Sequence, residues 1–177
     1  MHPIEVEESL NSMVILCDTR EQPTRAYKRR LESMGRPYER VALISGDYSA
    51  RVTLPDGTPY SFADKVSIER KMSANEISRN FTSGRDQFKR EFDRFTGAGG
   101  KLYLLIERTD WGSILRHQYN TQFSPKSFIA SLMAWQARYN TQILFCQPED
   151  TGHLIERILY YEIKERLERG DADDHCG

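Results

Sequence analysis

Four short segments of the sequence place charged side chains at or beside the ends of apolar runs. They are Cys17-Asp18-Thr19-Arg20-Glu21, Gly46-Asp47-Tyr48, Ile68-Glu69-Arg70-Lys71, and the run from Leu102 to Ile106 that ends in Glu107. Hydrolysis of a phosphodiester needs a nucleophilic water and stabilisation of a charged transition state, and carboxylates that hold Mg²⁺ or Mn²⁺ can supply both. These residue types therefore indicate a divalent-metal site of the kind that suits a nuclease.

The segment Glu69-Arg70-Lys71 carries the clearest geometric expectation. On a strand, residues i and i+2 point to the same face, so Glu69 and Lys71 should converge on one site while Arg70 points to the opposite face. Lys71 would then orient the attacking water or hold the phosphate, with Glu69 as a metal ligand. A Glu-x-Lys pattern is also typical of exposed strands with alternating charges, so it does not decide the chemistry by itself.

The elements that position these residues alternate between strands and helices at both ends of the chain. Short apolar runs predict strands at about residues 13–17, 38–43, 48–54, 60–62, 66–68, 102–106 and 143–145. Apolar spacing and caps predict helices at 24–34, after Ser73, at 84–95 and 111–118, after Ser124, and at 151–169. With the turn Pro55-Asp56-Gly57, the centre is expected to be an antiparallel meander. The predicted fold class is α/β, with a hairpin-rich mixed sheet between helices.

Length and composition favour one globular domain. The 177 residues include 29% charged and 38% hydrophobic residues, and no apolar run approaches the ~20 residues that cross a bilayer. We expect an acidic tail over residues 1–12, the domain over 13–169 and a polar tail over 170–177. The three cysteines form no CxxC pair, and the acidic beginning lacks the features of a signal peptide, so a cytoplasmic protein with no membrane partner is expected.

In their order along the chain, the four segments resemble the XPF-type nuclease domain. This is the excision-repair cross-complementing group 4 nuclease domain, a member of the restriction-endonuclease-like superfamily. The motifs are Asp18-Thr19-Arg20-Glu21, Gly46-Asp47-Tyr48, Glu69-Arg70-Lys71 and a strand ending in Ile106-Glu107, and the resemblance covers roughly residues 14–163. It implies a restriction-endonuclease-like core and cleavage of branched, flap or fork DNA with Mg²⁺ or Mn²⁺, in repair or recombination.

The resemblance also assigns roles to individual residues. It implies six catalytic residues, namely Asp18, Arg20, Asp47, Glu69, Arg70 and Lys71. Asp47 and Glu69 would bind the metal and Asp18 would complete the acidic cluster as a further metal ligand, whereas Arg20 and Arg70 would support it or contact the scissile phosphate. The metal role of Glu107 is the least certain. The Gly84-Arg85 pair also matches the family, and we expect DNA contacts from Arg79, Arg85 and Lys89.

Two departures from the family pattern bear on activity. Asn75 stands where the family usually has an aspartate, followed here by Glu76. Asparagine keeps an oxygen donor but loses the charge, so metal affinity would fall if this position binds the metal directly. The gap between Asp47 and Glu69 is also longer than usual. Its turn chemistry predicts an extended hairpin beside the site, which would contact DNA or be a plain insertion.

The source of branch specificity and the rival functions stay open at this point. Relatives often carry a tandem helix-hairpin-helix domain and work as dimers, and the residues after 169 leave no room for such a domain. Specificity would then come from a homodimer, a partner or the nuclease surface. The apolar residues Leu154, Ile158, Tyr161 and Leu167 suit the core better than a dimer surface. The rival functions are a catalytically silent DNA-binding or scaffold subunit and a metal-dependent hydrolase of small phosphate esters.

Overall fold

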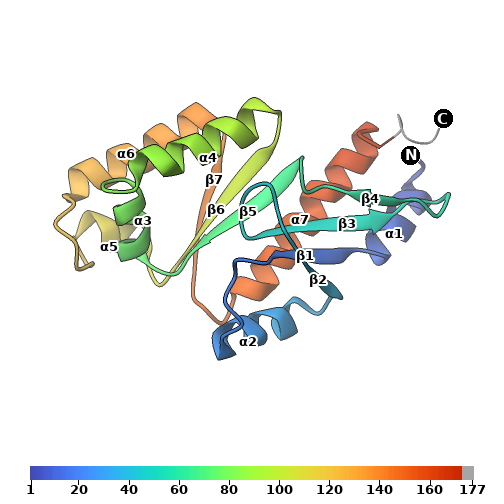
Figure 1. Cartoon of the computed structure of the whole chain (residues 1–177), viewed down its shortest axis with the longest axis horizontal. Helices are drawn as coiled ribbons and strands as arrows, with labels where there is room; N and C mark the ends of the chain where they lie inside the picture. Colours follow the sequence, from blue (N-terminus) through green and yellow to red (C-terminus); the bar gives the residue numbers. More distant parts are fainter. Residues whose placement is uncertain (173–177) are drawn as a thin grey trace.

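The computed structural model describes residues 1–172 and contains a seven-stranded mixed sheet between two layers of helices (Figure 1). The strands are β1 (Val14–Asp18), β2 (Tyr38–Val41), β3 (Tyr48–Thr53), β4 (Pro59–Ser61), β5 (Val66–Lys71), β6 (Lys101–Glu107) and β7 (Gln142–Cys146). Their order is β2-β1-β3-β5-β6-β7, and β4 pairs with β3 outside this path. The predicted α/β class with a mixed sheet is confirmed.

A parallel and an antiparallel part of the sheet meet beside the charged segments. Strands β5, β6 and β7 run parallel, whereas β3 runs antiparallel to β1, β4 and β5. The contact between β3 and β5 pairs Tyr48 with Ile68. Continued by one residue, this antiparallel register places Asp47 beside Glu69, and residues opposite each other project from the same face with Cβ atoms about 5 Å apart. The topology therefore brings two of the charged segments together.

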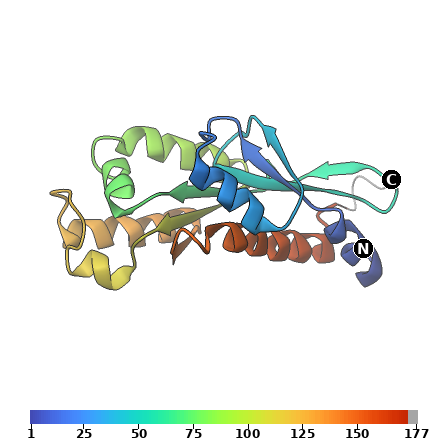
Figure 2. The same ribbon diagram turned by 90° about the horizontal axis from the view of Figure 1, so that it is seen from below.

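Helices cover both faces of the sheet and divide the core into two apolar clusters. The helices are α1 (Pro3–Asn11), α2 (Arg25–Met34), α3 (Ala74–Asn80), α4 (Arg85–Gly97), α5 (Trp111–Leu115), α6 (Pro125–Tyr139) and α7 (Thr151–Arg169). Along β6, Leu105 packs in the cluster that contains residues of α1, α2 and α7, whereas Leu104 and Ile106 pack with residues of α3, α4, α5 and α6. Figure 2 shows α7 on one side of the sheet and α4 on the other.

The expected acidic tail over residues 1–12 is wrong, because residues 3–11 form helix α1. His2 and Glu5 cap the beginning of the helix reciprocally, and Pro3 occupies its first turn. Val6 and Leu10 lie one helical turn apart and are buried against the core. Acidic residues hide this short amphipathic pattern, since they occupy the exposed face. At the other end, Gly170 closes α7 in the left-handed conformation, and residues 173–177 of the predicted polar tail lie outside the described residues.

The central meander is only partly correct, because β2 does not pair with β3. Strand β2 lies at the edge of the sheet, parallel to β1, with Ile15 opposite Tyr38. Helix α2 connects these two strands, and a helical crossover is the usual connection between parallel neighbours. The antiparallel pairs of β3 with β4 and β5 agree with the prediction. Apolar patterns identify strands, but they do not identify the partner of each strand.

The hairpin between Asp47 and Glu69 also lies elsewhere than predicted. Its turn is closed by Leu54 N, which donates to Thr58 O at 2.8 Å. Asp47 precedes the first residue of β3, whereas the turn follows the last residue of this six-residue strand, which places the turn about 20 Å from Asp47 at ~3.3 Å per residue. Figure 1 shows β4 at the end of the molecule where α1 lies. The hairpin therefore projects away from the acidic residues.

The apolar residues of α7 divide between the core and the surface. Leu167 is buried, Leu154 and Ile158 are half-buried, and the Tyr161 side chain is exposed. Among the described residues, no helix combines the length and the apolar composition that crossing a membrane would require.

Candidate active site at the junction of β3 and β5

The loop before β3 holds Asp47 in a fixed position. Gly46 has φ of 73°, and a Cβ atom on it would lie 2.2 Å from Ser67 Oγ, so a side chain does not fit here. Asp47 N donates to Ile68 O at 2.8 Å, and Asp18 N donates to Asp47 O at 2.9 Å. The backbone of Asp47 is thus bonded to both β1 and β5, and a substitution at Gly46 would displace it.

Asp47 and Glu69 form a carboxylate pair that lines a pocket of about 180 Å³. Asp47 Oδ2 accepts a hydrogen bond from Arg70 N at 2.8 Å, and Glu69 Oε1 accepts from Lys71 Nζ at 2.6 Å. Burial raises the pKa of both carboxyl groups, and the charge of Glu69 raises the pKa of Asp47 further. Two carboxylates that are crowded and partly desolvated have a strong need for a cation.

Lys71 lies on the same face of β5 as Glu69, as the strand alternation predicts. Its ammonium is 2.6 Å from Glu69 Oε1 and 3.9 Å from Glu76 Oε1, and the side chain is almost buried. Burial lowers the pKa of Lys71, but Glu69 and Glu76 outweigh that effect and raise it. Lys71 therefore remains a cation beside the acidic pocket.

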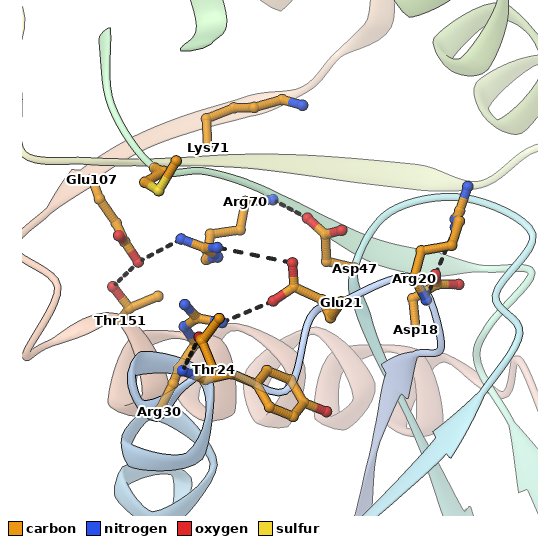
Figure 3. Close-up of polar contacts among 12 residues, drawn as sticks. Asp18, Arg20, Glu21, Thr24, Arg30, Asp47, Arg70, Lys71, Glu107 and Thr151 are labelled. Atoms are coloured by element: carbon orange, nitrogen blue, oxygen red, sulfur yellow. Dashed lines mark hydrogen bonds and ion pairs between the residues drawn. The ribbon is translucent and has the colours of Figure 1, made fainter. Parts of the chain in front are cut away.

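Arg70 points to the opposite face of β5 and belongs to a buried polar network (Figure 3). Its Nη1 atom lies 3.2 Å from Glu107 Oε1, and its Nη2 atom lies 3.8 Å from Glu21 Oε1. Glu107 Oε1 also accepts from Thr151 Oγ1 at 2.8 Å. The Glu107 carboxylate thus binds Arg70 and Thr151 on the face away from Asp47. These contacts give Glu107 a structural role that does not require a metal ion.

Glu21 extends the same network to helix α2. Its Oε2 atom accepts from Arg30 Nη1 and from Tyr48 OH, both at 2.9 Å, and Arg30 Nη1 donates to Tyr48 OH at 2.6 Å. Tyr48 is the first residue of β3 and is fully buried. The network therefore connects the loop after β1 with β3, β5 and α2.

Asp18 is held by the chain itself. Its Oδ1 atom accepts from Arg20 N at 2.8 Å and from Arg20 Nε at 2.6 Å, and its Oδ2 atom accepts from Leu43 N at 2.8 Å. These bonds hold the pKa of Asp18 below its usual value despite its burial, which acts in the opposite direction. Figure 3 shows Asp18 turned toward Arg20. In this arrangement Asp18 positions Arg20, and Asp18 is not among the residues that line the pocket of Asp47 and Glu69.

The donor set fits a divalent cation bound mainly by one pair of carboxylates. Among residues 1–172, no group of three or more His, Cys, Asp or Glu side chains has the geometry to hold a metal ion. Mg²⁺ commonly binds through one or two carboxylates and completes its shell with water and substrate phosphates. Asp47 and Glu69 supply oxygen donors of this kind, and burial raises the pKa of both carboxyl groups.

Asn75, which stands where the family usually has an aspartate, binds a loop instead of the acidic pair. Asn75 Oδ1 accepts from Asn120 N at 2.7 Å, in the loop before α6. Its neighbour Glu76 caps the beginning of α3 by accepting from Met72 N at 2.7 Å, and its other oxygen approaches Lys71. The acidic side chain near Lys71 in this part of the chain is therefore that of residue 76.

The structure places the three predicted DNA-binding residues away from the lining of the acidic pocket. Arg85 donates to Phe81 O and Ser131 Oγ and lies 5.4 Å from the ring centre of Trp135. Lys89 pairs with Asp93 at 2.5 Å, and Arg79 is an exposed residue of α3. Basic side chains at the pocket are instead Arg20 and Arg94, and Glu91 lines it as well. Residues 87, 90, 91 and 94 are three or four positions apart, a spacing that places them on one side of α4 and that could have indicated this basic surface from the sequence.

Comparisons with known proteins identify the family and the fold of this chain. The model of the ERCC4 domain matches residues 17–158. XPF from Aeropyrum pernix has a similar structure, with a TM-score of 0.61 and 20% identity, covering 84% of this chain and 61% of that chain. For XPF from Aeropyrum pernix in complex with DNA, the TM-score is 0.62 and the identity 21%, covering 87% of this chain and 66% of that chain. No sequence among the curated proteins matches.

This chain therefore spans less than two thirds of either XPF structure, and at such identity the likeness concerns the fold. The family model is a separate finding, and it includes the motif segments at Asp18, Asp47, Glu69 and Glu107. Since the model covers most of the chain and the motifs meet at one end of the sheet, the chain belongs to the ERCC4 domain family of XPF-type nuclease domains.

Proposed function

We propose that this protein is a metal-dependent DNA endonuclease that hydrolyses phosphodiester bonds at branched, flap or fork DNA during repair or recombination. The observation that carries the proposal is the Asp47–Glu69 pair, whose burial raises both pKa values, with the Lys71 ammonium 2.6 Å from Glu69. Membership of the nuclease-type family supports the reaction class. A relative of similar fold that was solved in complex with DNA supports the substrate class.

Asp47 and Glu69 would hold Mg²⁺ or Mn²⁺. A divalent cation in such a site lowers the pKa of a bound water and offsets charge on the phosphate. Lys71 then provides a second, fixed positive charge on the same face of β5, where it orients the attacking water or binds a phosphate oxygen. Arg20 reaches the same pocket, and Asp18 fixes its direction. We therefore assign Asp18 as a positioning residue instead of a direct metal ligand.

Arg70 has a supporting role in this proposal. Its backbone N–H binds Asp47 Oδ2, while its side chain binds Glu107 and lies near Glu21 on the other face of β5. Loss of the side chain would leave the buried carboxylate of Glu107 without the cation that lies 3.2 Å from it and would shift β5, on which Glu69 and Lys71 stand. Arg70 thus acts through the carboxylates and not on the phosphate.

A homodimer or a partner protein that adds branch specificity, and a cytoplasmic setting, belong to the same proposal. Exposed Tyr161 beside half-buried Leu154 and Ile158 is an apolar surface of α7 that suits contact with another chain. A catalytically silent DNA-binding subunit is the second candidate, because Asn75 replaces an acidic residue and bonds to Asn120.

A cleavage assay separates these functions. Linear, flap and fork DNA are incubated with Mg²⁺ or Mn²⁺ and the wild type, Glu69→Gln or Lys71→Ala, with Asp64→Asn at an exposed position before β5 as the control. We expect wild-type and control cleavage, and a loss of about 10²-fold or more in both site variants. Calorimetric metal titration should show binding lost in Glu69→Gln and retained in Lys71→Ala. DNA binding without cleavage under either metal would support the silent subunit instead.

A further inference from the structure

A solvent-open groove of about 740 Å³ runs along α4 beside the acidic pocket. It is lined by Arg20, Gln87, Arg90, Glu91, Asp93 and Arg94. Three of these residues, Arg20, Glu91 and Arg94, also line the pocket of Asp47 and Glu69. The groove and the acidic pocket are therefore neighbouring parts of one depression, between α4 and the loops that follow β1 and β2.

The groove is predominantly basic once the internal ion pairs are considered. Asp93 is already neutralised, because its carboxylate binds Lys89 Nζ at 2.5 Å and Tyr139 OH at 2.8 Å. Arg90 is exposed and makes no ion pair or hydrogen bond within residues 1–172. Arg94 is exposed and uses one nitrogen to donate to Ile44 O at 3.0 Å. These two guanidinium groups thus retain most of their donors for a ligand.

Arg20 supplies the third positive charge from the opposite wall. Its side chain is 66% exposed although its Nε atom is bound to Asp18. The remaining acid, Glu91, also lines the pocket of Asp47 and Glu69, and its charge raises the pKa of Glu69. Positive charge therefore predominates along the groove, whereas negative charge gathers where a metal ion would bind.

We infer that this groove binds the backbone phosphates of the nucleic-acid strand on one side of the scissile bond, with Arg90 and Arg94 as phosphate contacts. The inference rests on the proposed nuclease function. Arg90 and Arg94 are one helical turn apart, so they project in the same direction about 6 Å apart along α4. An open groove with repeated guanidinium groups suits a polymer of phosphates, whereas a small phosphate ester would need only the acidic pocket.

Equilibrium binding of fluorescein-labelled fork DNA in EDTA tests the inference without any contribution from metal or cleavage. Arg90→Ala should weaken binding about tenfold, the loss of one charge-assisted contact, and Arg90→Glu should weaken it further. The slope of log affinity against log salt should fall by about 0.7–0.9 for Arg90→Ala. The matched control is Arg169→Glu on α7, where the arginine is also exposed and binding should stay within about twofold.

Each outcome decides between the groove and the nuclease proposal. The groove inference is overturned if wild type and Arg90→Glu bind fork DNA with equal affinity. It is also overturned if Arg169→Glu loses as much affinity as Arg90→Glu. If the wild type cleaves DNA and Arg90→Glu binds DNA with the same affinity as the wild type, the groove does not bind DNA but the nuclease proposal stands. Arg90-dependent binding without cleavage in Mg²⁺ or Mn²⁺ keeps the groove and rejects the nuclease. No binding by the wild type rejects the groove. A thermal melt checks that Arg90→Glu folds, which is expected because the residue is exposed.

Discussion

Replacing Asp47 by asparagine should stabilise the metal-free protein while it removes the metal site. The pKa of Asp47 is raised by burial first and by the charge of Glu69 second, so the folded state resists its ionisation. Asparagine keeps the oxygen that accepts from Arg70 N, which is the hydrogen bond Asp47 makes at 2.8 Å. Asp47→Asn therefore removes the unfavourable charge with little change of shape.

The magnitude follows from the sheet register. Two carboxylates whose Cβ atoms lie about 5 Å apart repel by about 3 kcal/mol at an effective dielectric constant of ~20. Lys71, bound to Glu69 at 2.6 Å, offsets part of this repulsion, and solvent screens more of it because Asp47 is only half-buried. We expect Asp47→Asn to gain about 1–2 kcal/mol in the free energy of unfolding at neutral pH, or about 2–8 °C in Tm.

The gain should depend on pH in a defined direction. The folded-state pKa of Asp47 lies above its unfolded value. Below pH ~4, where Asp47 is protonated in both the folded and the unfolded protein, it therefore does not lower the free energy of unfolding of the wild type. The penalty grows as the pH rises from the unfolded to the folded pKa and is complete above the latter. The stability difference between Asp47→Asn and wild type should thus be near zero at acidic pH and largest in the alkaline range.

Thermal and urea unfolding in EDTA, from pH 4 to pH 8.5, measure this difference. Asp64→Asn is the matched control, since its carboxylate is 63% exposed, and its stability should change by less than ~0.5 kcal/mol. Adding Mg²⁺ or Mn²⁺ should raise the Tm of the wild type and of the control but not of Asp47→Asn. A variant less stable than wild type at neutral pH, or a gain that does not vary with pH, would refute the reasoning.

Four further substitutions have defined outcomes. Asn75→Asp should not raise metal affinity in calorimetric titration, because the side chain faces Asn120 and not the acidic pair; a clear gain would contradict this placement. Tyr48→Phe removes a buried hydroxyl that binds Arg30 and Glu21, and urea unfolding should show a loss of about 1–3 kcal/mol. Gly46→Ala should cost about 2–4 kcal/mol and abolish the metal-induced rise in Tm, because its Cβ would lie 2.2 Å from Ser67 Oγ. Leu10→Ala should cost about 2–5 kcal/mol in urea, whereas a dispensable tail would show no change.

Local patterns were enough to identify most elements of this fold. Short apolar runs located β1, β6 and β7, and caps such as Ser73 and Ser124 located the beginnings of α3 and α6. Each of these signals depends on only a few neighbouring residues, so it can be recognised without knowing how the rest of the chain folds. The acidic surface of α1 masked its two buried residues, Val6 and Leu10, and the same local reasoning therefore missed it.

The chemistry of β5 was also a local prediction. Alternation along a strand places Glu69 and Lys71 on one face and Arg70 on the other, and the structure agrees. The order of the four motifs predicted that Asp47 would join them. Its position beside Glu69 depends on the antiparallel pairing of Tyr48 with Ile68.

The sequence alone determined most of the elements, the charged faces of β5 and the family, since each depends on residues close together in the chain or on motif order. The tertiary structure decided the rest: it placed β2 beside β1, turned Asp18 toward Arg20, paired Arg70 with Glu107, and lined the groove beside the acidic pocket with Arg90 and Arg94. A charged side chain has several partners within reach, and the one it takes depends on packing between distant segments. No local pattern records that choice.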